Sequence, residues 1–255
     1  MWDTLIINPM INILLLVYNL LGQNFGLAII VFTALVRLIL FPLTAKQMAS
    51  TKKMQELQSS KKLQEIKKKY KGDKQKEQEE TLKLYRELGI NPLSGCLPTL
   101  IQLPIIFGLY QAITRALADA PLQLLELSRH LYSWNPSSLI PLNNTFLWMD
   151  LSQPERLYLP FLPNFGIPVL TILVVITTWF QTKMTTPQTP DSQGAQMSRM
   201  MSLYMPLFLG YLAYIFASGL ALYLVVSNLL TIVQYALRDR IKINIKLPKL
   251  FKRRE

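Results

Sequence analysis

The sequence predicts an all-α integral membrane protein: a bundle of five transmembrane helices, a helical hairpin on the cytoplasmic side and an interfacial helix at the N-terminus. Three observations predict this class. Charged residues make up 16% of the 255 residues, whereas soluble proteins usually carry about 25%. Apolar residues occur in runs near the length of about 20 residues that crosses a bilayer. The net charge of +12 is concentrated in the connections between those runs.

The first segment, residues 1–23, is apolar but short. Asn8, Pro9, Asn12 and Asn19 interrupt it. It lacks the basic start and the small-residue cleavage site of a signal peptide. We expect an extracytoplasmic helix that lies in the membrane interface, where apolar stretches of this length often occur. A sixth span is the alternative.

Five longer runs are the expected transmembrane helices. In chain order they are residues 24–44, 95–118, 167–183, 200–217 and 220–237. The last two come from one uninterrupted run of about twice the length of a span. Ser218 and Gly219 mark the turn between them, because small residues of this kind favour tight turns.

The basic residues of the connections predict how the bundle is oriented. The connection 45–92 is rich in lysine, the tail 238–255 is basic, and the connection 184–199 carries Arg199. The connection 119–166 has few basic residues for its length, and the turn before residue 220 has none. Cytoplasmic loops carry the excess of Lys and Arg. The alternation therefore predicts an N-terminus outside and a C-terminus inside.

The connection 45–92 has the pattern of two helices. Apolar residues recur at helical spacing on both sides of Lys71–Asp73, which breaks the pattern. We expect a helical hairpin in the cytoplasm. Its lysines either form a solvated face near anionic lipid or dock an incoming chain or partner. The candidates for docking are Lys52, Lys53, Lys67, Lys68 and Lys69.

Arg37 stands in the first span with no acidic residue near it in sequence. A charge at the centre of a span costs about 2.5–3.5 kcal/mol on insertion scales. The basic end of the span at Lys46 is roughly 13 Å away along a straight helix, which is too far for the side chain to reach cheaply. We therefore expect Arg37 to face water inside the bundle.

Polar residues at helical spacing in the spans are candidates for the same wet interior. They are Thr33, Gln102, Thr178, Gln181, Tyr223, Ser227, Asn228 and Thr231. The structural alternative is hydrogen bonding between helices, which polar residues in membrane helices often provide. One positive charge among neutral hydrogen-bonding groups suits a groove that shelters a polar stretch of polypeptide. An acidic residue on that stretch would be attracted to Arg37.

The sequence gives no support to an enzyme. Cys96 is the only cysteine and His130 the only histidine, so neither a disulfide nor a zinc site is expected. There is no glycine-rich phosphate loop and no hydrolase or metalloprotease motif. We expect no metal, no cofactor and no DNA partner, because the positive charge is segregated between apolar runs.

Several stretches resemble the YidC family of membrane protein insertases, which is related to the mitochondrial and chloroplast insertases. They include "VRLILFPLTAKQ", "LYRELGINPLSGCLPTLIQLPIIFGLYQAI", "WFQTKM" and "MPLFLGYLAYIFASGLALYLVVSNLLTIVQ". The resemblance extends from about Asn8 to about Arg240. It implies a hydrophilic groove whose charge is Arg37, open to the cytoplasm and closed outside.

The resemblance also implies an activity and partners. The expected function is insertion of nascent membrane proteins into the bacterial inner membrane, alone or with the Sec translocon and without ATP. Membrane lipids are the second partner, and the basic tail is a candidate contact for ribosomes. Two alternatives remain: a small-anion transporter that binds with Arg37, and a scaffold whose lysines bind ribosomes or lipid.

Overall fold

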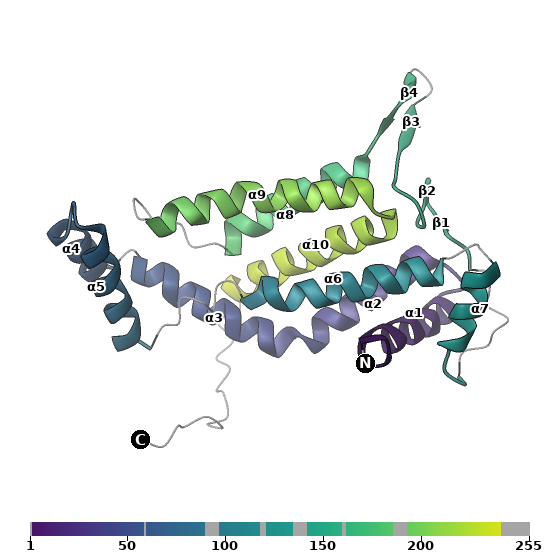
Figure 1. The fold of residues 1–255 in the computed structure, drawn as a ribbon, viewed down its shortest axis with the longest axis horizontal. Helices are drawn as coiled ribbons and strands as arrows, with labels where there is room; N and C mark the ends of the chain where they lie inside the picture. Colours follow the sequence, from purple (N-terminus) through teal and green to yellow (C-terminus); the bar gives the residue numbers. More distant parts are fainter. Residues whose placement is uncertain are drawn as a thin grey trace.

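The computed structural model shows an elongated, mostly helical protein (Figure 1). It describes residues 2–58, 60–89, 97–117, 121–134, 142–159, 162–185 and 193–240. Several of the features predicted above lie partly or wholly outside these ranges. Among them are the tail beyond residue 240, parts of the connections 45–92, 119–166 and 184–199, both ends of the span 95–118, and Cys96.

The N-terminal segment is helical throughout its described length. A π-helical turn, η1 (Asp3–Ile7), leads into α1 (Asn8–Leu20), and α2 (Phe25–Ile39) follows after a short turn. Asn24 caps α2, because its side-chain oxygen accepts a hydrogen bond from the Leu27 amide at 3.0 Å. Together η1 and α1 are long and apolar enough to cross a membrane. The interfacial placement of this segment stays a prediction.

The first predicted span is divided in the structure. α2 ends at Ile39, and α3 (Phe41–Gln58) continues at an angle of 64° to it. Pro42 accounts for the break, because proline has no amide hydrogen and its ring clashes with the carbonyl of the preceding turn. Arg37 therefore lies in the last turn of α2, directly before the bend. Because of this bend, Arg37 and Lys46 do not lie on one straight helix. The separation of roughly 13 Å that a straight helix predicts between them therefore does not apply.

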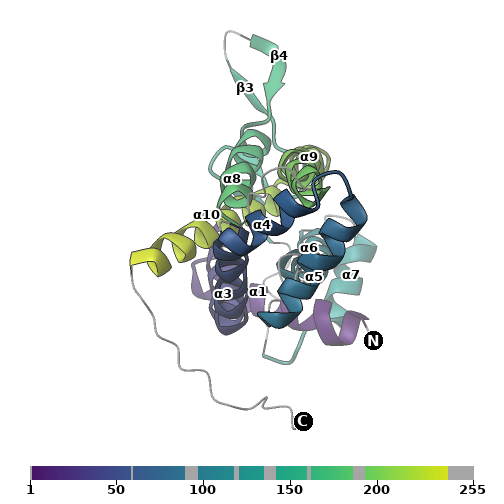
Figure 2. The same cartoon turned by 90° about the vertical axis from the view of Figure 1, so that its left-hand side faces the viewer.

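Two short helices form the predicted helical hairpin. α4 (Lys61–Lys69) and α5 (Lys74–Glu87) pack against each other at one end of the molecule (Figures 1 and 2). Leu57, Leu63 and Leu84 are buried between them and the end of α3. The cytoplasmic location of this pair stays a prediction.

The bundle is built around the last helix. Its members are α6 (Leu97–Ala116), α8 (Val169–Thr185), α9 (Gln193–Ile215) and α10 (Ser218–Arg240). α10 contacts α2, α6, α8 and α9, and its residues from Leu220 to Val225 are all buried. Side chains on different faces of α10 can therefore form hydrogen bonds with different helices of the bundle.

Not every helix has the length of a full span. Within the described residues, two helices are long and apolar enough to cross a membrane: η1 with α1, and Ser218–Leu237 of α10. The bent α2–α3 pair is a third if the bend lies within one span. The apolar part of α8 is Val169–Thr185 and that of α9 is Ser202–Ile215, and both are shorter. The count of five spans stays a prediction.

The connection 119–166 is not the plain loop of an all-α protein. It contains α7 (Pro121–Arg129) and four short strands, for which the sequence analysis made no prediction. The strands are β1 (Thr145–Phe146), β2 (Met149–Asp150), β3 (Leu157–Leu159) and β4 (Leu162–Ile167). They form two antiparallel hairpins, β1–β2 and β3–β4. The second hairpin projects sideways from the bundle (Figures 1 and 2).

The same connection is fastened to the start of α10. The Ser218 amide donates to the Gln153 carbonyl at 2.8 Å, and the Ser218 hydroxyl donates to the Asp150 carbonyl at 2.6 Å. The Gly219 amide donates to the Leu151 carbonyl at 3.1 Å. These bonds satisfy amides at the N-terminus of α10 that have no partner within the helix.

Candidate functional site

Arg37 reaches from α2 to α10. Its Nη2 atom donates a hydrogen bond to the Ser227 hydroxyl, and the side chain is only half-buried. Among the residues that the structure describes, no carboxylate forms an ion pair with Arg37. A hydroxyl orients the guanidinium but leaves its positive charge uncompensated. The site can therefore accept an anionic group.

A second polar contact lies one turn earlier on α10. The Gln102 amide of α6 donates to the Tyr223 hydroxyl, and Tyr223 precedes Ser227 by one helical turn. Tyr223 and Ser227 are each 2% exposed. We call Arg37, Gln102, Tyr223 and Ser227 the arginine cluster. It joins α2, α6 and α10, three helices far apart in sequence.

Asn228 forms a separate polar contact with α8. Its Nδ2 atom donates to the Thr177 hydroxyl at 3.1 Å and to the Thr178 hydroxyl at 2.8 Å. The Thr177 hydroxyl in turn donates to the Leu173 carbonyl at 2.7 Å. All three polar side chains are buried. For Thr178 and Asn228, the structure thus places the side chains as hydrogen-bonding partners between helices.

The hydroxyl groups of Thr33 and Thr231 donate hydrogen bonds within their own helices. The buried Thr33 hydroxyl donates to the Ile29 carbonyl of α2 at 2.6 Å. The buried Thr231 hydroxyl donates to the Ser227 carbonyl of α10 at 2.8 Å. Gln181 is half-buried, one turn after Thr178 on α8. Hydrogen bonds therefore join only some of the predicted groove residues to one another, and the role of the others stays a prediction.

Three side-chain amide atoms are buried without a partner in the described part of the chain. They are Oδ1 of Asn8 on α1, Nε2 of Gln47 on α3 and Oε1 of Gln234 on α10. An unpaired buried polar atom is costly, so each is a candidate contact for a ligand. Gln47 was not predicted as a site residue, because it lies within the lysine-rich connection 45–92. The signal that the sequence offered was Thr51, a second polar residue one helical turn after Gln47. The structure buries both side chains.

The lysines proposed for docking lie on the surface of the helical pair and the end of α3. Lys52, Lys53, Lys68 and Lys69 are exposed, and Lys67 is half-buried. The Lys69 ammonium lies 5.4 Å from the centre of the Tyr70 ring. Exposed lysines of this kind suit a solvated face as well as a docking surface, so their role stays a prediction.

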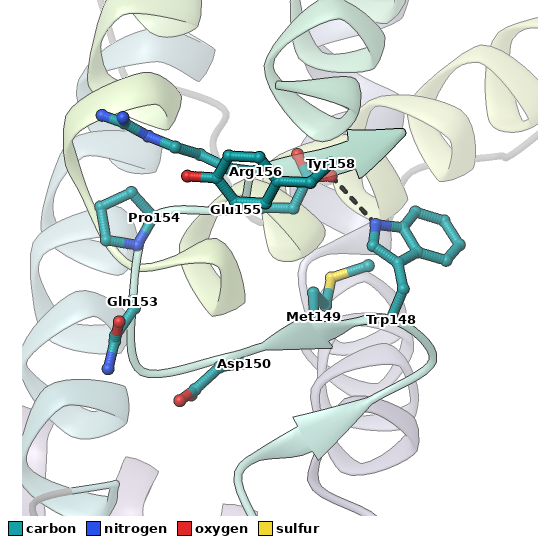
Figure 3. Close-up of a pocket in the computed structure, with 8 residues that line it drawn as sticks. All are labelled: Trp148, Met149, Asp150, Gln153, Pro154, Glu155, Arg156 and Tyr158. Atoms are coloured by element: carbon teal, nitrogen blue, oxygen red, sulfur yellow. Dashed lines mark hydrogen bonds between the residues drawn. The ribbon is translucent and has the colours of Figure 1, made fainter. Parts of the chain in front are cut away.

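A hollow of about 420 Å³ lies beside the strands (Figure 3), and no residue of the arginine cluster lines it. It is lined by Trp148, Met149, Asp150, Gln153, Pro154, Glu155, Arg156 and Tyr158. The buried Glu155 carboxylate accepts hydrogen bonds from the Trp148 indole at 2.9 Å and from the Leu170 amide at 3.1 Å. A carboxylate at the start of α8 is also favoured by the helix dipole. In the described part of the chain no group of His, Cys, Asp or Glu side chains is arranged to hold a metal ion.

These features define a class of protein: a helical membrane protein with an uncompensated positive charge and neutral polar groups inside its bundle. The model of a family described as "60Kd inner membrane protein" matches residues 16–245. The chain belongs to this family, the YidC family of membrane protein insertases. The resemblance noted from the sequence motifs is confirmed.

Relatives and a solved structure support this assignment. Membrane protein insertase YidC 2 of Bacillus anthracis is 36% identical over 91% of this chain and 79% of its own length. Membrane protein insertase MisCA of Bacillus subtilis is 35% identical over 91% of this chain and 77% of its own. A crystal structure of an active YidC insertase matches with a TM-score of 0.57 and 31% identity. That match covers 92% of this chain and 46% of the solved one.

Proposed function

We propose that this chain inserts membrane proteins by binding short hydrophilic segments of nascent chains at the arginine cluster. The apolar spans of the client then leave sideways into lipid, driven by burial of their apolar surface. The single observation that carries the proposal is the bonding of Arg37: its charge faces a neutral hydroxyl, and no described carboxylate neutralises it.

The energetics favour a transient anionic partner. A hydrogen bond between a guanidinium and a carboxylate is roughly twice as strong as one between neutral groups. The attraction also grows in a site that excludes bulk water. An acidic residue of a client can therefore displace the Ser227 hydroxyl from Arg37. The unpaired amide atoms of Gln47 and Gln234 supply a donor and an acceptor for the backbone of the same segment.

The proposal includes a location and partners. The chain lies in the bacterial inner membrane with its N-terminus outside and α4–α5 in the cytoplasm. Nascent membrane proteins and lipids are its direct partners. It acts alone or with the Sec translocon, and the basic tail contacts ribosomes.

The decisive experiment is insertion by the purified chain in otherwise protein-free liposomes. A small client with an acidic tail is compared with the same client carrying a neutral tail, and protection of the tail from protease is measured. We expect insertion of both, with the acidic tail inserted faster. Failure of purified, folded protein to protect either tail would contradict the proposal.

Photo-crosslinking identifies where the client binds. A photoreactive residue at Gln102 or Gln181 should capture a ribosome-bound nascent membrane protein. The matched control is position Leu207 of α9, which is 58% exposed on the outside of the bundle. Equal capture at Leu207 and at Gln102 would contradict binding inside the bundle.

The same liposomes separate the alternatives. A small-anion transporter would accumulate a labelled anion, and an insertase should not. A scaffold whose lysines bind ribosomes or lipid would lose its function when the tail is removed. Substitution of Arg37 would not change the function of such a scaffold.

A further inference from the structure

The β3–β4 hairpin has an apolar sequence and no neighbouring layer. Leu157–Ile167 reads "LYLPFLPNFGI", without a charged residue. Figures 1 and 2, which are views at right angles, both show the hairpin projecting sideways from the bundle. The two strands pair with each other, and no helix packs extensively on them among the described elements. An isolated two-stranded hairpin is marginally stable in water, so this one needs another surface.

The apolar stretches described next to the hairpin are shorter than a bilayer core. They are Val169–Thr185 of α8 and Ser202–Ile215 of α9, roughly 25 Å and 21 Å long by helical rise, although α9 as a helix begins earlier, at Gln193. The hydrocarbon core of a bilayer is about 30 Å thick. β4 leads directly into α8, so the hairpin extends the apolar surface at the end where α8 begins. The helices expose apolar side chains along that surface: Ile172, Ile176, Phe180, Leu207, Phe208 and Tyr211.

Aromatic and basic side chains are fixed where the hairpin meets the bundle. Tyr158 is 57% exposed and stands opposite Gly166, where a Cβ atom would lie only 3.2 Å from the tyrosine ring. The Arg156 guanidinium lies 5.6 Å from the centre of the Tyr214 ring of α9. The Trp148 side chain is half exposed, and its indole nitrogen donates a hydrogen bond to the Glu155 carboxylate (Figure 3). Aromatic residues and arginine are the side chains typical of membrane–water boundaries.

The opposite end of α8 carries a matching pair. The Lys183 ammonium lies 3.7 Å from the centre of the Trp179 ring, and Trp179 is 40% exposed. A lysine beside an exposed tryptophan is typical of a membrane boundary. The apolar surface of α8 is therefore bounded by the hairpin at one end and by Trp179 and Lys183 at the other.

We propose that the β3–β4 hairpin is a lipid anchor. It lies in the boundary between headgroups and acyl chains, in the leaflet at the end of the molecule opposite α4–α5. Arg156, Trp148 and Tyr158 lie at the level of the headgroups. The hairpin does not enter the hydrocarbon core, because the outer edge of each strand pairs with no other described strand and its backbone groups need water. Lipid is favoured over a second copy, because the hairpin continues the apolar surface of α8 and α9.

Spin-label accessibility in vesicles tests the depth of the hairpin. The full-length chain carries Cys96→Ser and one new cysteine, and is reconstituted in phosphatidylethanolamine and phosphatidylglycerol vesicles. The probe is Asn164→Cys in β4. The reference for water is Glu87→Cys, exposed on α5, and the reference for lipid is Ile176→Cys, which replaces a side chain that is 45% exposed on α8. Collisions with oxygen and with a water-soluble nickel complex are compared.

We expect the ratio of oxygen to nickel collisions at Asn164→Cys to lie between the two references and several-fold above that of Glu87→Cys. A ratio equal to that of Glu87→Cys would overturn the proposal. Protection from both reagents would overturn it too, because the hairpin would then be covered by protein. Broadening of the spectrum that disappears on dilution with unlabelled protein would assign the surface to a second copy.

A charge in the hairpin provides a second measurement. Phe165→Asp in the labelled chain should shift the ratio toward the water reference, and the matched control Phe165→Ile should not. An unchanged ratio in Phe165→Asp would contradict lipid contact. Arg37→Gln should leave every ratio unchanged while it slows insertion. The collision ratios therefore test the lipid anchor, and the insertion rate tests the insertase proposal, so that either proposal can fail without the other.

Discussion

Arg37 is the residue whose charge we expect a client to recognise. Replacing it by glutamine removes the charge but keeps a polar side chain of moderate size. We expect Arg37→Gln to slow insertion of a client with an acidic tail by roughly tenfold or more. A hydrogen bond to a charged group contributes about 1.5–3 kcal/mol, and 1.4 kcal/mol corresponds to a factor of ten. Protease protection of the tail in liposomes measures the rate.

The control for this prediction is Arg37→Lys. Lysine keeps the charge but loses the planar, forked geometry of the guanidinium, so the rate should fall between those of the native chain and the glutamine variant. If Arg37→Gln slows neutral and acidic tails equally, Arg37 acts through folding or hydration and not through attraction to a carboxylate.

Asn228 has a different role at the same scale. Because its amide bonds to both Thr177 and Thr178, Asn228→Leu should destabilise the bundle by about 1 kcal/mol. Hydrogen bonds between membrane helices average about 0.6 kcal/mol each. Unfolding in mixed detergent micelles measures the change, with Leu229→Ala on the exposed side of α10 as the control. Native stability combined with lost client crosslinking would instead place Asn228 in the client site.

At the scale of the element, the start of α5 depends on one carboxylate. The Asp73 side chain accepts a hydrogen bond from the Lys76 amide at 3.2 Å. This bond is the main cause that lowers the pKa of Asp73 below its usual 3.8, and the nearby Lys76 ammonium adds to it. A pKa that is lower in the folded state means that the cap stabilises α5 above pH 3.8. That stabilisation disappears as the pH falls through the lowered pKa.

We therefore expect the first turn of α5 to lose protection from amide hydrogen exchange below pH 3.8, after correction for the intrinsic exchange rate. The measurement is made on the full chain in micelles. Asp73→Asn is the matched control, because asparagine also caps helices but does not titrate. Equal loss of protection in the two proteins would show that another group controls this turn.

At the scale of the whole molecule, the orientation in the membrane can be tested directly. We expect α4–α5 inside the cell and the strands outside, because lysine-rich loops remain in the cytoplasm. With Cys96→Ser in place, a membrane-impermeant maleimide should label Leu147→Cys on intact spheroplasts. Leu147 is 75% exposed in the turn between β1 and β2. Glu87→Cys should be labelled only after lysis, and the reverse pattern would invert the predicted topology.

The basic tail is also considered at the scale of the whole molecule, because its proposed partner is the ribosome. Deleting residues 241–255 should leave insertion by the purified chain in liposomes unchanged and should weaken its sedimentation with ribosomes. Each Lys or Arg near a surface of opposite charge contributes about 1 kcal/mol. Loss of insertion in liposomes after the deletion would favour the lysine scaffold over the arginine cluster.

Some of the fold could be predicted from local patterns. α8 begins and ends two residues after the predicted bounds 167–183, and the break at Lys71–Asp73 separates α4 from α5. The turn predicted at Ser218 and Gly219 lies just before them, because α9 ends at Ile215 and Ser218 already begins α10. The bend after Arg37 was not predicted, although Pro42 was visible in the sequence. The strands were not predicted either, because their short apolar segments lack the alternation that identifies a half-buried strand.

The polar positions within the apolar helices, and the distribution of basic residues between those helices, can be read from the amino-acid sequence. Both are local properties, and helical periodicity places Tyr223 and Ser227 on one side of α10 without further information. The helix that each of these side chains meets depends on the packing of the whole bundle. Ser227 faces Arg37, 190 residues away in sequence, whereas the adjacent Asn228 faces α8. Periodicity fixes a face of a helix, but the neighbour of that face depends on how all the helices pack together.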